Sequence, residues 1–66
     1  MILDGSRVKE LRIKSGLSQF KLSLELEMDR KLISLIENNE RKQVWLCTAY
    51  KLAKYFNVKI EELIKE

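Results

Sequence analysis

The chain has 66 residues, of which 45% are hydrophobic and 35% are charged, with 13 Lys and Arg against 10 Asp and Glu and a formal net charge of +3. This length fits one folded domain over residues 1–66 and excludes two, and the apolar content excludes a disordered chain. One Cys and no His exclude an internal disulfide, a Cys/His zinc site and the usual catalytic groups, so we expect no metal, no cofactor and no enzyme activity.

The longest apolar run covers only residues 44–47, far fewer than the roughly 20 that span a bilayer. The N-terminus also lacks the apolar segment of a secretory signal. We therefore expect a soluble cytoplasmic protein with no membrane partner. A charge of +3 is too small to identify a polyanionic partner by itself.

The chain has no Pro, only two Gly and no alternating polar and apolar stretch, which predicts an all-α fold. Helix ends then have to be found from capping residues and from shifts of the apolar phase, and five helices result. The first is predicted over residues 6–15. Asp4 or Ser6 can cap it, and Gly16 can supply the left-handed residue that ends it.

Two short helices follow. Ser18 is a good N-cap for a helix that ends near Leu26, and Asp29 is a good N-cap for a helix from Arg30 to about Asn38. The inward positions of the second of these, at helical spacing, are Ile33, Ile36 and Glu37. Only a short turn separates the two helices.

Residues 38–43 are all polar and predict an exposed connection. A longer helix is predicted over 44–56, ended by Asn57 in the left-handed conformation. Its apolar residues at helical spacing are Leu46, Ala49, Leu52, Ala53 and Phe56. We expect Cys47 to be a small buried side chain. A last helix is predicted over 60–65.

The spacing of the second and third helices is typical of a helix-turn-helix, which lays its second helix in the major groove of DNA. The residues around this spacing make the signal specific. They are Leu11, Arg12, residues 16–19, Leu22, Ile33, Ser34 and residues 36–38. With these motifs, the sequence from Ser6 to Ile64 resembles the helix-turn-helix family of lambdoid phage repressors and Cro proteins, also called the XRE family.

The resemblance implies a five-helix, lambda-repressor-like DNA-binding domain whose helix-turn-helix is formed by the second and third helices. The family's base-reading positions fall on Arg30, Lys31 and Leu35, with Ser34 beside them. Its phosphate-contacting positions fall on Gln19 and Asn38, and the basic residues Arg41 and Lys42 follow in the exposed connection. Arg12 and Glu37 match a partly buried structural ion pair, and each is a charge on an otherwise apolar helix face. Glu27 stands in the turn where the family usually has Gly, so we expect either a left-handed backbone at Glu27 or a turn of another shape.

We expect a transcriptional repressor or controller that binds a two-fold symmetric double-stranded DNA operator as a homodimer. In the last helix, we assign Leu63 to the core and Ile60 and Ile64 to the dimer interface. Phage repressors, controllers of restriction-modification genes and antitoxins are all compatible with this sequence. The alternative function is a protein-interaction module or antitoxin that uses the fold to bind a partner protein. Three residues favour it because they are apolar where the family is usually polar: Ile13, Phe20 and Leu24.

Overall fold

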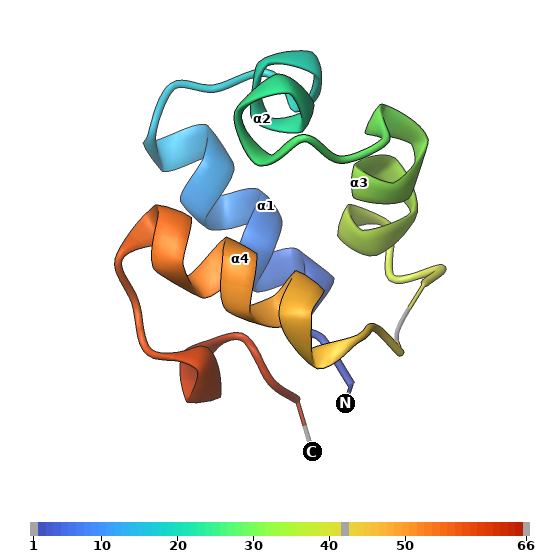
Figure 1. The fold of residues 1–66 in the computed structure, drawn as a ribbon, viewed down its shortest axis with the longest axis vertical. Helices are drawn as coiled ribbons and strands as arrows, with labels where there is room; N and C mark the ends of the chain where they lie inside the picture. The colour runs from blue at the N-terminus through green and yellow to red at the C-terminus, as the bar shows by residue number, and fades with distance from the viewer. Residues whose placement is uncertain (1, 42, 66) are drawn as a thin grey trace.

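The computed structural model describes residues 2–41 and 43–65, and these form four α-helices followed by a short 3-10 turn. The elements are α1 (Gly5–Lys14), α2 (Gln19–Leu26), α3 (Arg30–Glu37), α4 (Leu46–Phe56) and the 3-10 turn η1 (Ile60–Glu62). Figure 1 shows α4 crossing in front of α1, with α2 and α3 at the top and the right. None of the helices in these residues has the length and apolar character needed to cross a bilayer. The all-α prediction is confirmed.

The starts of the first three helices are fixed by the caps predicted from the sequence. Asp4, Ser18 and Asp29 each accept a hydrogen bond from a backbone N–H two or three residues later, at 2.9 to 3.2 Å. Such a cap satisfies one of the N–H groups that a helix start leaves without a partner. Helix α4 begins two residues later than predicted, after Trp45, whose side chain makes no capping hydrogen bond.

Left-handed residues mark the ends of the helices and the connections between them. The φ angles are 72° at Gly16, 54° at Glu27, 60° at Asn39 and 56° at Asn57. The predictions for Gly16, Glu27 and Asn57 are therefore confirmed. Glu27 is the costliest of the four, because a side chain with a Cβ is strained in this conformation by roughly 1 kcal/mol and Asn tolerates it better.

The buried apolar side chains come from every helix and from both ends of the chain. They are Leu3, Val8, Leu22, Leu26, Ile33, Ile36, Ala49, Leu52, Ala53 and Leu63. Two residues of α4 differ from expectation, since Leu46 is 61% exposed and Cys47 is also exposed. Leu46 shares the apolar phase of α4 with Ala49 and Ala53, but it is the first residue of the helix, where no other element covers it.

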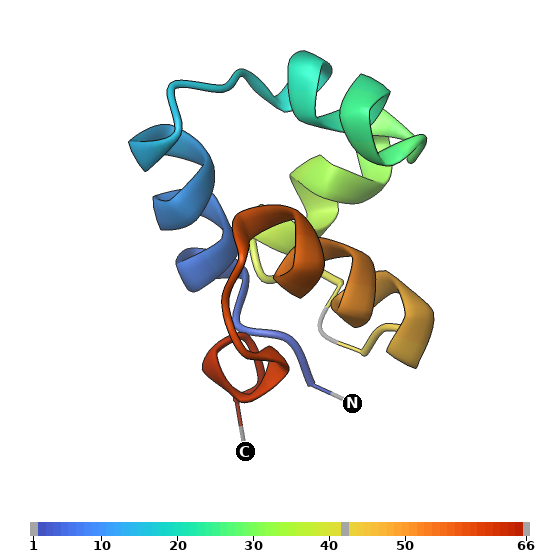
Figure 2. The same ribbon diagram turned by 60° about the vertical axis from the view of Figure 1, so that its left-hand side comes forward.

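The predicted fifth helix over 60–65 is wrong: the helical part is only the 3-10 turn at 60–62. The residues after it pair with the N-terminal segment, where Leu3 forms an antiparallel bridge with Ile64. The Asp4 N–H donates to the Leu63 carbonyl at 2.7 Å, and the Lys65 N–H donates to the Ile2 carbonyl at 2.9 Å. Figure 2 shows the two ends of the chain together below α4. Backbone groups used in this pairing cannot extend a helix.

Leu63 is fully buried, as predicted. Ile60 and Ile64, the predicted dimer residues, are half-buried and pack against the core. Both belong to the last segment of the chain, which lies beside the N-terminal segment at the end of the molecule away from α2 in Figure 1. Their proposed contact with a second protomer stays a prediction.

Candidate nucleic-acid interface

Helices α2 and α3 are joined by three residues, 27–29, and both bury apolar side chains in the shared core. Glu27 reverses the chain in its left-handed conformation, and the Met28 N–H donates back to the Ser23 carbonyl at 3.0 Å. The buried Ser23 hydroxyl donates to the Phe20 carbonyl at 2.6 Å, so this polar group has a partner inside the core. The two helices are therefore held in a fixed relation, as a helix-turn-helix requires.

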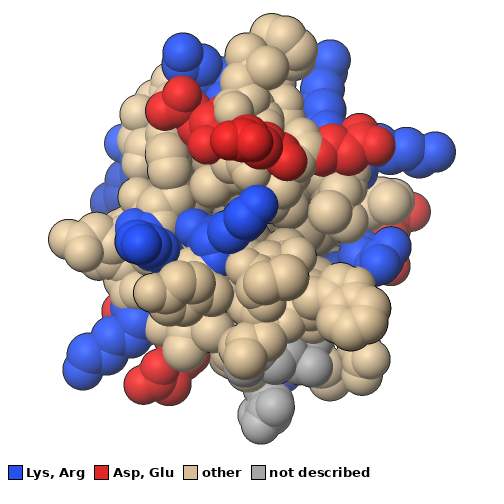
Figure 3. All heavy atoms as spheres, viewed as in Figure 1, with Lys and Arg blue, Asp and Glu red and all other residues tan. Residues whose placement is uncertain are grey.

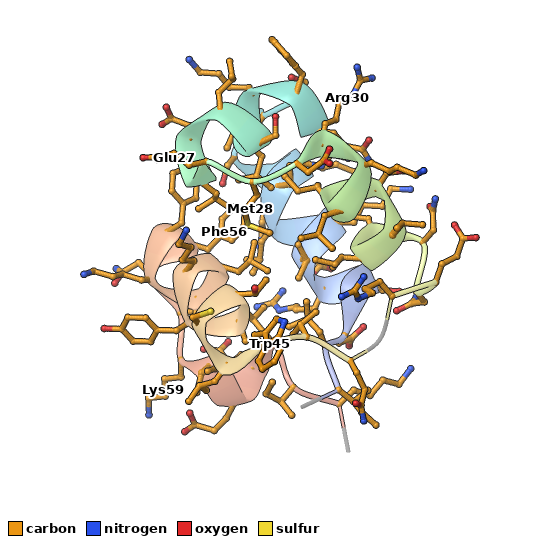
Figure 4. All side chains as sticks on the ribbon, turned by 45° about the vertical axis from the view of Figure 1, so that its right-hand side comes forward. Glu27, Met28, Arg30, Trp45, Phe56 and Lys59 are labelled. Carbon is orange, nitrogen blue, oxygen red and sulfur yellow. The ribbon has the colours of Figure 1, made fainter. Side chains whose placement is uncertain are left out.

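Helix α3 has one buried face and one face turned to solvent. Ile33, Ile36 and Glu37 are buried, as predicted from their spacing. The opposite face is formed by the exposed Arg30, Lys31 and Asn38 and the half-buried Ser34 and Leu35. Figure 4 shows Arg30 at the start of α3, pointing away from the body of the molecule. The structure thus brings all four predicted base-reading residues onto one accessible surface.

Basic side chains accompany this surface. Figure 3 shows Lys and Arg side chains projecting from the side of the molecule that carries α3, with acidic side chains among them. Arg41 is exposed beyond the end of the helix, and its backbone N–H donates to the Leu35 carbonyl at 3.0 Å. Lys42, the other predicted phosphate contact in this connection, lies outside the described residues.

Behind the solvent face, α3 is anchored by a buried charge network. Arg12 donates to both carboxylate oxygens of Glu37, from Nε at 2.7 Å and from Nη2 at 3.0 Å. The side chains of Arg12 and Glu37 are only 12% and 1% exposed. Arg12 Nη1 donates to the Leu17 carbonyl at 2.7 Å, and Gln19 Nε2 donates to Glu37 Oε1 at 3.1 Å. This bidentate ion pair and its two further hydrogen bonds therefore connect α1, the start of α2 and the end of α3.

The Gln19 side chain contacts α3, the helix that the resemblance implies it supports. It is the first residue of α2, half-buried, and its amide nitrogen is directed to Glu37. Any phosphate contact that Gln19 makes therefore has to use its backbone N–H at the helix start or an atom that this hydrogen bond leaves free. The same amide positions the end of α3 through Glu37.

A second contact between α1 and α3 was missed in the sequence. The Gly5 N–H donates to Asn39 Oδ1 at 3.1 Å, and Asn39 Nδ2 donates to the Ser6 hydroxyl at 3.3 Å. Gly5 lies directly against α3, since a Cβ placed on it would be 1.8 Å from the Ile36 carbonyl oxygen. The available signal was a Gly at the first helical position, directly after the cap Asp4, where most other residues favour the helix more.

The groups whose pKa is shifted lie away from α3. Partial burial and the nearby Glu25 carboxylate, which accepts a hydrogen bond from the Tyr55 hydroxyl at 3.3 Å, raise the pKa of Tyr55. The hydrogen bond from Arg7 to Glu10 raises the pKa of Arg7. Both shifts favour the form that already dominates at neutral pH, so the positive charge near α3 does not depend on them. Among residues 2–41 and 43–65, no three His, Cys, Asp or Glu side chains gather as metal ligands would.

Comparison with known proteins agrees with this geometry. The family described as "Helix-turn-helix domain" matches residues 5–66. The high-resolution crystal structure of the restriction-modification controller protein C.AhdI from Aeromonas hydrophila matches with a TM-score of 0.79 and 33% sequence identity, over 91% of this chain and 89% of that one. No curated protein matches the sequence.

The C.AhdI match shows that the fold is lambda-repressor-like, built here from four helices and a 3-10 turn. The family match covers nearly all of the chain and includes both helices of the helix-turn-helix. The chain therefore belongs to the helix-turn-helix family of DNA-binding transcriptional regulators.

Proposed function

We propose that this protein is a sequence-specific regulator of transcription that acts as a homodimer on a two-fold symmetric double-stranded DNA operator. The observation that carries the proposal is the two-sided construction of α3. Its outer face presents Arg30 and Lys31 to solvent, while Ile33, Ile36 and Glu37 anchor its inner face. A rigidly held helix with basic residues at its exposed start is what major-groove recognition requires.

Each residue of the outer face has a chemical role in this proposal. Arg30 and Lys31 suit the O6 and N7 acceptors of guanine, and Leu35 suits the methyl group of thymine. Ser34, beside them, can hydrogen bond to a base edge of either kind. The residues proposed to contact DNA phosphates on either side of the major groove are Gln19, Asn38, Arg41 and Lys42.

The likeness to a restriction-modification controller favours that class of regulator over a phage repressor or an antitoxin. We therefore propose a controller that acts in the cytoplasm, where DNA is accessible to it. For the contact between protomers, the sequence predicts Ile60 and Ile64, whose side chains are half-buried and so keep part of their surface free.

The proposal is tested by selecting binding sites from random duplex DNA and then measuring affinity for the selected and for unrelated duplexes at two salt concentrations. We expect a two-fold symmetric site, bound more tightly than unrelated DNA at both concentrations. Because phosphate contacts are sensitive to salt, both affinities should fall as the salt concentration rises. Base contacts should preserve the difference between the affinities for the selected and the unrelated duplexes. Equal affinities for all duplexes would contradict the proposed specificity.

Replacing Arg30 or Lys31 with Ala is expected to weaken binding to the selected operator by roughly 1 to 3 kcal/mol each and to relax the base preference at one position per half-site. Lys59→Ala is the control, because it removes one positive charge at the other end of the molecule from Arg30 (Figure 4). It should change affinity little. Operator binding as tight as the parent's in both α3 variants would show that α3 does not read bases there.

The alternative function, binding of a partner protein, also has an observation in its favour. Ile13, Phe20 and Leu24 are 58%, 56% and 57% exposed. Phe20 and Leu24 lie one turn apart on α2, and exposed apolar side chains on one surface are typical of contact sites between proteins. A chain that shows no preference among duplexes but loses a specific protein partner when Phe20 is replaced with Ser would favour this alternative.

A further inference from the structure

The start of α4 carries large apolar side chains that the rest of the chain does not cover. Trp45 is 76% exposed, Leu46 61% and Tyr50 57%. Leu46 and Tyr50 lie one turn apart on the same flank of α4, and Trp45 directly precedes them. We call these three residues the α4 apolar patch. Exposed apolar side chains collected in one place are typical of a contact surface.

The size of the patch suits an interface between proteins. An aromatic side chain carries roughly 150 to 250 Å² of surface. With most of two such residues and of a Leu exposed, the patch offers on the order of 300 to 400 Å², about half of the ~800 Å² that each partner buries in a standard interface. Ile2, which is 38% exposed and bridges to Gln43 just before the patch, extends the apolar area.

The same face also has a hollow, lined by Arg41, Gln43, Val44 and Trp45. A two-fold symmetric contact uses the same surface on both partners, so that surface must carry both the protruding group and the space that receives it. Here the exposed side chains of the patch and the hollow lie side by side on one short stretch of chain. This arrangement fits a second copy of the same chain.

The position of the patch relative to α3 points in the same direction. The connection from the end of α3 leads directly into Trp45, and the Leu35 carbonyl accepts the N–H groups of Glu40 and Arg41 at 2.9 and 3.0 Å. Figure 4 shows Trp45 below α3, between the connection and α4. In a two-fold symmetric contact through this patch, the connections that follow α3 in the two copies would come together, so that both α3 helices lie near the contact. Recognition of two half-sites about one DNA turn apart needs two such helices held at a fixed separation.

We propose that the α4 apolar patch is the surface on which a second copy of this chain docks. This inference rests on the proposed function for its DNA geometry, but the contact itself is a property of the protein alone. Its centre is Trp45 and Leu46. Ile60 and Ile64, half-buried against the core, have less free surface to offer.

The chain provides its own reporter of this contact, because Trp45 is its single Trp. In sedimentation without DNA, we expect a monomer–dimer equilibrium. The emission of Trp45 should shift to shorter wavelength, and its quenching by acrylamide should weaken, over the same concentration range in which the dimer forms. A dimer whose Trp45 emission and quenching match the monomer's would overturn the proposal.

The decisive variant is Leu46→Glu. A carboxylate in the first turn of α4 favours the helix, so the monomer should stay folded, which circular dichroism checks. We expect the dissociation constant of the dimer to rise about 30-fold or more, because a charge is placed at the centre of the contact. Leu24→Glu is the matched control: Leu24 has nearly the same exposure, 57%, but lies on α2. It should leave dimerisation within about twofold of the parent.

The outcomes separate this inference from the proposed function. If Leu46→Glu dimerises like the parent, or if Ile64→Lys dissociates a folded dimer while Leu46→Glu does not, the α4 apolar patch is not the interface. If the patch is the interface and the parent binds no duplex DNA, the proposed function fails and the docking surface stands. Loss of cooperative operator binding in Leu46→Glu, with weak binding to unrelated duplex retained, would support both.

Discussion

Replacing Arg12 with Met is expected to lower the free energy of unfolding by about 3 kcal/mol, one of the largest effects of any single substitution outside the apolar core. The substitution keeps an unbranched, flexible side chain but leaves the Glu37 carboxylate, only 1% exposed, with the Gln19 amide as its remaining side-chain donor. A buried charge without its counter-ion costs more than the pair itself contributes. Denaturant unfolding followed by circular dichroism measures the loss.

The double variant, in which both Arg12 and Glu37 become Met, is the control for this argument. It removes both charges from the interior, so its loss of stability should be smaller than the sum of the two single losses. The Leu17 carbonyl, which accepts from Arg12 at 2.7 Å, loses its donor in both Arg12 variants and therefore does not distort the comparison between them. Strictly additive losses would show that the two side chains do not stabilise one another.

The network also connects stability to recognition. Because Glu37 ends α3 and Gln19 begins α2, a change at Arg12 alters the support of the helix that carries Arg30 and Lys31. Operator affinity in the Arg12 variant should therefore fall even under conditions in which the protein is fully folded. If Arg12 and Glu37 support α3 mainly by filling space between the helices, the double variant should recover part of that operator affinity.

Much of the helical content could be predicted because the responsible interactions are local. The caps Asp4, Ser18 and Asp29 act on N–H groups two or three residues away, and the buried face of α3 follows from helical spacing. Arg12 and Glu37 could be paired, although 25 residues separate them in the sequence, because the family resemblance implies the pair and each is a lone charge on an apolar face.

The errors have a common physical origin in contacts between distant parts of the chain. The last helix was predicted from the apolar spacing of residues 60–65, but residues 63–65 form hydrogen bonds to residues 2–4. Leu46 fits the apolar phase of α4, yet whether a side chain is buried depends on what packs over it. No pattern along a single helix contains that information.

The proposed base-reading residues were placed by resemblance and spacing together, and in the structure they lie on one face of α3. What spacing could not give was the second anchor of that helix. Helix α1 holds the end of α3 at two places, through the ion pair of Arg12 with Glu37 and through the close approach of Gly5 to Ile36. This second anchor depends on Gly5, whose lack of a side chain lets α1 approach the α3 backbone.

Gly5→Ala is expected to destabilise the protein by about 3 kcal/mol. The loss is large because the new methyl group would meet backbone atoms, which cannot move aside as a flexible side chain can. The new Cβ would lie 1.8 Å from the Ile36 carbonyl oxygen and 2.8 Å from its carbon. Relief requires α1 to move away from α3. That movement also lengthens the 3.1 Å hydrogen bond from the Gly5 N–H to Asn39. Thermal and denaturant unfolding both measure the loss.

Gly16→Ala is the comparison that isolates close approach from backbone preference. Gly16 has a φ of 72°, and no atom lies within 4 Å of the position its Cβ would take. Its replacement should therefore cost only the strain of a left-handed Ala, about 1 kcal/mol. Equal losses at the two positions would show that α1 does not contact α3 at Gly5. The expected difference of about 2 kcal/mol would instead establish that contact as the second support of the recognition helix.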